Sequence, residues 1–265
     1  MSTEPRHDPV LTPKDRQFPG DSIYTQIASY SNRLTPSPDQ EFKRGNEVEY
    51  QLVDLSTLDS QRLINSLAEK IYNSIEHPVF SQQSHEMPYP IENFEDLLSK
   101  KDATVILAWR KGHPKPVTSN PELVGYIIGY PYQTGEIAKA ERLDINGNFG
   151  PEPAVGDLVF DTFATSQPGQ QIGTSLMHLF ISQALAKKPD AKPVNLFTFA
   201  VDPESIPPSA QKSAFPYTRQ MLKHNPALHF ISENHIPNYR GIKAFYMKFS
   251  ILSPKEQLSN SFPRQ

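Results

Sequence analysis

Two aspartates in one apolar stretch have the residue type and the spacing for general-base chemistry. Both lie in the run from Asp157 to Ala164, which is typical of a β-strand. Strand geometry predicts two faces, one with Asp157, Val159, Asp161 and Phe163 and the other with Leu158, Phe160 and Thr162. A carboxylate among apolar side chains has a raised pKa unless donors compensate, and a raised pKa suits a base that works near neutrality.

Each aspartate also has a plainer interpretation. Asp157 follows Gly156 at the start of the strand, so it could be an exposed edge or turn residue. Asp161 could be a carboxylate that is satisfied by neighbouring loop amides. Residue types alone leave these alternatives open.

The turn after this strand has the composition of an anion-binding element. Gln167 to Gly173 contains two glycines, and an amphipathic helix is expected from Thr174. A helix N-terminus presents unpaired N–H groups and roughly half a positive elementary charge. A phosphate group would suit that position.

The elements that must position these residues form a mixed α/β sheet of the α+β kind. Apolar patterns predict strands at 47–53, 104–110, 123–130, 194–201, 228–236 and 242–252 beside the strand with the aspartates. Helices are expected over 58–75, ending before Pro78, and over 91–101 and 209–224. The order is β-α-α-β-β-β-α-β-α-β-β, with a polar, Gly-rich connection at 131–154 that is expected to be functional or mobile.

Composition divides the chain into one domain and two tails. Residues 1–45 contain six prolines and no sustained apolar period, so they are predicted to be a disordered arm. Residues 46–253 form the folded domain, and residues 254–265 form a polar C-terminal tail. The acceptor pocket is expected to involve the connection at 131–154 and the Pro-containing segment 202–213.

Charge and residue counts exclude several classes of function. The formal net charge of -3 gives no basic excess for nucleic acid or an anionic membrane, and the absence of cysteine excludes disulfides and thiolate chemistry. The histidines have no metal-binding spacing, so no metal is expected. The N-terminus has no apolar leader, which favours a cytoplasmic location, and the oligomeric state is left open.

The element order and the Gly-containing turn resemble the GCN5-related N-acetyltransferase (GNAT) family over residues 47–252. The family loop has the form Gln/Arg-x-x-Gly-x-Gly/Ala, and Pro168 to Gly173 takes that place here. Pro168 replaces the family's Gln or Arg, and Gln171 replaces its first Gly. The resemblance implies the GNAT-like acyl-CoA N-acyltransferase fold.

The resemblance implies acetyl-CoA as co-substrate and assigns residues to it. The pantetheine arm and thioester would contact the main chain of Phe163, Ala164 and Thr165, and the pyrophosphate would contact Gly169, Gln170, Gln171, Ile172, Gly173 and Thr174. Alignment on Gly173 places Asp157 at the position of the family's catalytic base. Tyr217 is the first candidate for the general acid, and a competing alignment that makes 238–246 helical offers Tyr246.

Two functions from different classes follow from this resemblance. The first is an acyltransferase that moves an acetyl group from acetyl-CoA to an amine acceptor, either a small molecule or a protein, by direct attack in a ternary complex. The alternative is a catalytically silent binding module of the same fold, which the substitutions at Pro168 and Gln171 keep open.

Overall fold

The structure is a computed structural model that describes residues 31–34, 48–55, 61–80, 90–100, 102–110, 121–167, 170–187, 194–202, 204, 216–239 and 242–253. The strands are β1 (Ser31–Leu34), β2 (Val48–Val53), β3 (Thr104–Arg110), β4 (Glu122–Pro131), β5 (Leu158–Thr165), β6 (Asn195–Val201), β7 (Leu228–Tyr239) and β8 (Ile242–Ile251). The helices are α2 (Gln61–Ile71), α3 (His77–Phe80), α4 (Ile91–Ser99), α5 (Ile172–Lys187) and α6 (Pro216–Lys223). A π turn, η4 (Tyr72–Glu76), joins α2 to α3, and a 3₁₀ turn, η5 (Lys139–Arg142), lies between β4 and β5.

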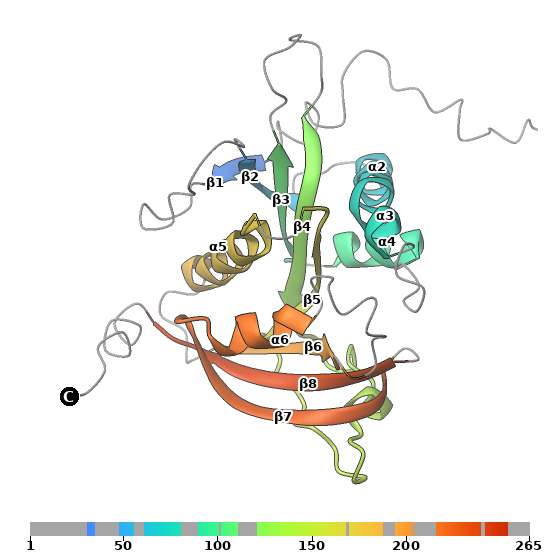
Figure 1. Cartoon of the computed structure of the whole chain (residues 1–265), viewed down its shortest axis with the longest axis vertical. Helices are drawn as coiled ribbons and strands as arrows, with labels where there is room; N and C mark the ends of the chain where they lie inside the picture. The colour runs from blue at the N-terminus through green and yellow to red at the C-terminus, as the bar shows by residue number, and fades with distance from the viewer. Residues whose placement is uncertain are drawn as a thin grey trace, which may run out of the picture.

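The described strands form one eight-stranded sheet in the order β1-β2-β3-β4-β5-β6-β8-β7 (Figure 1). Neighbours pair antiparallel except for β5 and β6, which are parallel. A parallel pair requires a crossover, and α5 supplies it between these two strands. The sheet is therefore mixed, as the sequence predicts.

Helices cover both faces of the sheet and bury a separate apolar layer on each (Figure 1). On one face α5 packs through Phe180 against the β3 and β4 layer that includes Ile106 and Ile127. On the other face α2 and α4 pack against the layer that includes Trp109 and Tyr126. These two layers hold the central strands in place, because their side chains alternate between the faces.

The order of elements from β2 to β8 is the order that the sequence predicts. Bounds differ at some ends: α5 begins at Ile172 rather than Thr174, and β7 continues to Tyr239. Helix α6 begins at Pro216, and the expected start near residue 209 lies outside the described residues. Most of the predicted arm and the whole tail from 254 also lie outside them.

Two predictions about the N-terminal part are wrong. Ser31–Leu34 forms a strand that pairs with β2, although residues 1–45 show no sustained apolar period. The main chain of β2 offers free hydrogen-bonding groups at its edge, which a short segment of any pattern can occupy. The helical segment also continues past Pro78, which lies in the first turn of α3 after the π turn, where a missing N–H is tolerated.

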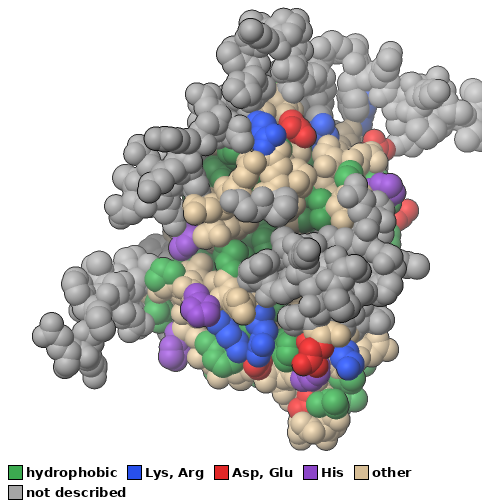
Figure 2. Space-filling view, in the orientation of Figure 1, with side chains coloured by type: hydrophobic (Ala, Val, Ile, Leu, Met, Phe, Trp, Pro, Cys, Tyr) green, Lys and Arg blue, Asp and Glu red, His purple; other side chains and the backbone are tan. Residues whose placement is uncertain are grey.

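The described part of the face in Figure 2 has no large patch of charge of a single sign. On the described part of the face in Figure 2, basic and acidic side chains occur near one another, consistent with a net charge of -3. No helix among the described residues is long and apolar enough to cross a bilayer.

Gly129 provides a test of the packing between α5 and the sheet. A Cβ at this position would lie 2.3 Å from Phe180 Cζ and 2.6 Å from the Val159 carbonyl oxygen. We expect Gly129→Ala to lower the free energy of unfolding by about 1–3 kcal/mol, because the main chain of β5 must shift. Urea unfolding measures this, with Ser182→Ala at an exposed position of α5 as the control that should change little. Equal stability of both variants would contradict the packing described.

Candidate active site

A β-bulge at Asp161 shapes the centre of strand β5. In the ladder between β4 and β5, Ile128 pairs with Thr162 and Gly129 pairs with Phe160, so Asp161 is the extra residue. A bulge of this kind interrupts the alternation of side chains along the strand. Bulges occur often beside active sites, where they redirect a side chain.

The bulge makes the predicted faces of β5 wrong from Thr162 onward, whereas Asp161 lies on the predicted side with Val159. Thr162 lies on the same side as Asp161, because their side chains bond to Tyr126 and Tyr130 of one apolar layer. Phe163 lies on the opposite side, with its ring centroid 5.4 Å from that of Phe160. A regular period of two cannot anticipate one inserted residue.

Strands β5 and β6 separate immediately after the bulge begins. Their parallel ladder covers three pairs, from Leu158 with Leu196 to Phe160 with Thr198. Beyond this point β6 continues to pair with β8, whereas β5 pairs with β4 alone among the described strands. Among the described strands, the side of β5 that faces β6 therefore has no ladder partner beyond Phe160; this side is called the open side of β5.

The predicted pantetheine contacts lie along this open side. Phe163, Ala164 and Thr165 are the last residues of β5. The Thr165 hydroxyl donates to the Val124 carbonyl oxygen at 2.9 Å, so that side chain is engaged within the sheet. What these three residues can offer a ligand is their main chain, as the resemblance implies.

The described part of the turn before α5 leads directly into the helix N-terminus. Gln171 has a φ of 59°, in the left-handed region that glycine adopts more readily, and α5 begins at the next residue. The Ser175 N–H donates to the Gln171 carbonyl oxygen at 3.0 Å, which closes the first turn of the helix. The N–H groups of Ile172, Gly173 and Thr174 then have no acceptor within the helix. Pro168 and Gly169 lie outside the described residues.

A cation that sequence reasoning missed lies beside this turn. Arg110, at the end of β3, donates through Nη2 to Gln170 Oε1 at 3.2 Å. A guanidinium group recognises phosphate well, so Arg110 adds positive charge where the phosphates are predicted. It is 60 residues away from Gln170 in sequence, and only the order of strands in the sheet brings the two together.

Asp157, which the sequence favours as the catalytic base, is buried, and its carboxylate accepts several hydrogen bonds. Its carboxylate accepts from the N–H of Ala154 at 2.9 Å and from the N–H and Nδ2 of Asn195 at 3.2 and 3.1 Å. It is 8% exposed, so it is not an exposed turn residue. These contacts tie the starts of β5 and β6 to the connection that precedes β5. Its assignment as the base stays a prediction, although the geometry is that of a structural carboxylate.

Asp161 has the environment of a proton acceptor. Burial raises its pKa to about 6, the bond from the Tyr130 hydroxyl at 3.2 Å and the Lys100 ammonium lower it, and Glu141 and Glu136 raise it. Its side chain points from the bulge toward the layer that holds Tyr130. It therefore combines a pKa near neutrality with a position at the point where β5 and β6 part.

A second carboxylate, Glu76, reaches the same strand through a hydrogen-bond chain. The Tyr126 hydroxyl donates to Glu76 Oε2 at 2.6 Å and lies 3.2 Å from Thr162 Oγ1. Burial raises the Glu76 pKa to about 7, and the Tyr126 bond lowers it. Sequence reasoning missed Glu76, because an ordinary helical period places it away from the centre of the apolar stripe.

The two tyrosines predicted as general acids have different outcomes. Tyr217 lies in α6, as predicted, but its side chain lies outside the described residues. Tyr246 lies on β8 and not on a helix, so the competing alignment of 238–246 is wrong. Pairing of β8 with both β6 and β7 fixes Tyr246 in a strand.

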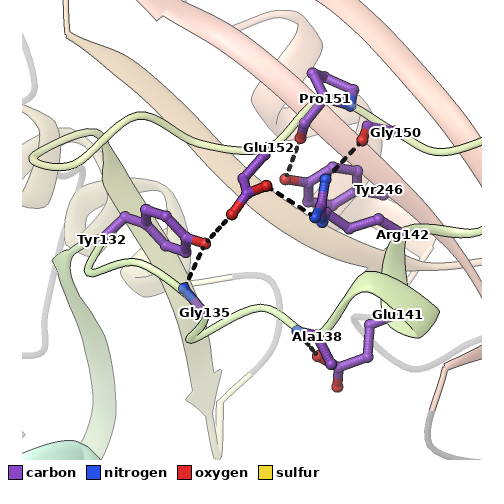
Figure 3. Close-up of polar contacts among 9 residues, drawn as sticks. All are labelled: Tyr132, Gly135, Ala138, Glu141, Arg142, Gly150, Pro151, Glu152 and Tyr246. Atoms are coloured by element: carbon purple, nitrogen blue, oxygen red, sulfur yellow. Dashed lines mark hydrogen bonds and ion pairs between the residues drawn. The ribbon is translucent and has the colours of Figure 1, made fainter.

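The connection at 131–154 is an ordered, packed segment rather than a loose loop (Figure 3). Arg142 is 7% exposed and donates to the Gly150 carbonyl oxygen at 3.0 Å and to Glu152 at 3.3 Å. Tyr132 donates to the other oxygen of Glu152 at 3.0 Å. The Tyr246 hydroxyl donates to the Pro151 carbonyl oxygen at 2.9 Å, which fastens the connection to β8. Polar residues here build internal structure, which composition alone does not reveal.

A metal site is not visible in the described residues, where no group of three potential His, Asp or Glu ligands comes together. The carboxylates that do approach the bulge are matched with tyrosines and a lysine.

Glu76 should make stability depend on pH. Its pKa is about 7 in the folded protein and 4.5 ordinarily, so the folded state holds the proton more tightly. Stability from this group is present below pH 4.5 and is lost as the pH rises to 7, by about 3 kcal/mol in all. The free energy of unfolding of the wild type, minus that of Glu76→Gln, should therefore fall between pH 5 and pH 8 in urea titrations. Parallel curves for the two proteins would contradict the burial of an ionisable Glu76.

Comparisons with known proteins find resemblance at the level of structure. No family model and no curated protein matches the chain. Among solved structures, NAA60 of Arabidopsis thaliana in complex with acetyl-CoA is 11% identical over 77% of this chain and 99% of that chain, with a TM-score of 0.43. Escherichia coli ElaA is 17% identical over 76% of this chain and 99% of that one, with a TM-score of 0.41.

A histone acetyltransferase HPA2 and related acetyltransferase from Corynebacterium glutamicum is 16% identical over 80% of this chain and 99% of that chain, with a TM-score of 0.39. At such identities and TM-scores these alignments assign no activity. The fold is instead defined by the chain's own features: the strand order, the bulge in β5, the parallel pair that parts, and the helix that follows. These features include the mixed sheet and the order of elements that the sequence predicts.

Proposed function

We propose that this protein is an N-acetyltransferase that moves an acetyl group from acetyl-CoA to an amine by direct attack in a ternary complex. The observation that carries the proposal is the parting of β5 from β6 at the Asp161 bulge, directly before the turn that starts α5. This strand thus combines a carboxylate with a pKa of about 6, main-chain groups that no second described strand pairs with, and a helix N-terminus that follows the next turn.

The residues of this chain fit the two halves of acetyl-CoA. The N-terminus of α5 and the Arg110 guanidinium would hold the phosphates, since both supply positive charge at the turn. The main chain of Phe163 to Thr165 would hold the pantetheine arm along the open side of β5. Acetyl-CoA supplies an activated acetyl group, and a main-chain N–H near the bulge would stabilise negative charge on its carbonyl oxygen.

Asp161 is the base that the geometry favours over Asp157. A general base must be ready to take a proton near the operating pH, and Asp161 with a pKa of about 6 meets this condition. The oxygens of Asp157 already accept bonds from Ala154 and Asn195. Asp161 would take the proton that the attacking nitrogen loses, and Tyr217 remains the proposed donor to the departing thiolate.

The acceptor class that fits is an amine that arrives as a cation. Glu136 and Glu141 lie within electrostatic reach of Asp161, since both raise its pKa. Lys100 neutralises Glu136 through an ion pair of 2.5 Å. The remaining negative charge would attract an ammonium group, and Asp161 would take the proton that this group must lose before its nitrogen attacks.

The alternative function, a catalytically silent binding module, is suggested by one residue in the turn before α5. Gln171 carries a side chain where the family loop has Gly, and a side chain can hinder the approach of a phosphate. Coenzyme binding separates the two functions. At a CoA concentration of about 100 times Kd, a ligand that binds only the folded state contributes about 2.7 kcal/mol, or a rise in Tm of about 5–10 °C. No rise at millimolar CoA or acetyl-CoA would overturn the proposed transferase.

Two matched substitutions test the base. We expect Asp161→Asn to reduce thiol release with a panel of primary amines by about 100-fold or more, with unchanged affinity for acetyl-CoA, because only proton transfer is lost. In the wild type kcat/KM should rise with pH across about 6 as Asp161 loses its proton. Asp157→Asn should instead lower Tm and leave the turnover of the folded protein largely intact. The reverse pattern would make Asp157 the base.

A further inference from the structure

A chain of hydrogen bonds from Glu76 through Tyr126 to Thr162 runs from the core to the edge of the candidate site. Glu76 and Tyr126 are 2% and 0% exposed, whereas Thr162 is partly exposed and follows the bulge residue directly. Three elements meet in it: the π turn, strand β4 and strand β5. Its two bonds are 2.6 and 3.2 Å long.

The π turn is what aims the carboxylate at β4. The His77 N–H donates to the Tyr72 carbonyl oxygen, five residues earlier, so this turn is wider than an α-helical turn. Ile75 and Glu76 are both buried as a result, although they are adjacent in sequence. A distortion of this kind is often found at functional sites.

The burial of the Glu76 carboxylate has a cost in free energy. Removing a carboxylate from water is costly, and well-packed apolar side chains of similar volume commonly replace buried polar groups at no loss. Glu76 is 2% exposed and accepts the Tyr126 hydroxyl at Oε2. The hydrogen-bond chain links this buried carboxylate to Thr162, which is partly exposed beside the bulge.

The direction of the hydrogen bonds fixes the Thr162 hydroxyl. An ionised Glu76 only accepts, so the single hydrogen of the Tyr126 hydroxyl must point to it. The Thr162 hydroxyl must then donate to the Tyr126 oxygen. This locks the side chain of Thr162 and, with it, the main chain at the residue after the bulge.

We propose that Glu76, Tyr126 and Thr162 are positioning residues that hold the β5 bulge in the geometry needed to bind the acetyl carbonyl of acetyl-CoA. This inference rests on the proposed function. When Glu76 is protonated, the Tyr126 hydroxyl can donate to Thr162 instead, so the hydrogen bonds no longer have a single donor order. Binding of the acetyl carbonyl is then weaker at low pH than at high pH.

Titratable groups on several of the described elements act on this hydrogen-bond chain. Tyr126 itself is on β4, and Asp161 on β5 affects it electrostatically. Asp161 in turn is affected by groups on other elements: Lys100 after α4, Tyr130 on β4, Glu136 and Glu141 in the connection, and Tyr239 on β7. Substitution of Glu76 separates its titration from that of Asp161.

The test compares the Kd of CoA with the Kd of acetyl-CoA by calorimetry on the full chain. The two ligands carry the same phosphates and differ in the acetyl group. The Kd of CoA divided by the Kd of acetyl-CoA therefore reports how strongly the acetyl carbonyl is bound, and a larger ratio means stronger binding. We expect Thr162→Val and Tyr126→Phe to reduce this ratio about fivefold, the effect of one hydrogen bond, with little change in the Kd of CoA. Thr162→Ser keeps the hydroxyl and should keep the ratio.

The pH dependence supplies a second readout that a purely structural role would not move. The ratio should rise between pH 6 and pH 8 in the wild type and stay flat in Glu76→Gln. Equal ratios in the wild type, Thr162→Val and Thr162→Ser, with folding confirmed by unfolding curves, would overturn the positioning role alone. Failure of the wild type to bind either ligand would overturn the proposed transferase, and the positioning role with it.

Discussion

The fit between β4 and β5 governs most of the structure around the candidate site. Because β5 has one residue more than β4 at this point, Asp161 leaves the ladder and the strand turns away from β6. Everything downstream follows that turn: the open main chain, the turn at Gln171 and the start of α5. A regular β5 would continue beside β6 and close the space that a ligand needs.

The sequence is informative about elements and weak about their irregularities. Continuous apolar runs predict β3 to its exact ends, and the core stripe with Met177 and Phe180 predicts α5. Period-based reasoning cannot show the bulge at Asp161 or the π turn at Glu76, because each inserts one residue into a regular repeat. Both irregularities nevertheless place a carboxylate at the candidate site.

Asp157 and Asp161 show why residue type and spacing do not rank two candidates. Both aspartates occupy one strand region, and alignment on the last glycine of the turn selects Asp157. The structure surrounds Asp157 with donors from Ala154 and Asn195, which come from segments three and 38 residues away. Such partners are set by tertiary contacts, so their effect on a carboxylate appears only in the folded chain.

The connection between β4 and β5 also has a consequence for one border of the sheet. The sheet has two outer strands, and outer strands can recruit another chain through their unpaired main-chain groups. At β7 the N–H of Ile145 already donates to the His235 carbonyl oxygen at 3.0 Å, and at the opposite border β1 is four residues long. The connection thus occupies one main-chain acceptor of β7, and the short β1 offers few main-chain groups at the other border.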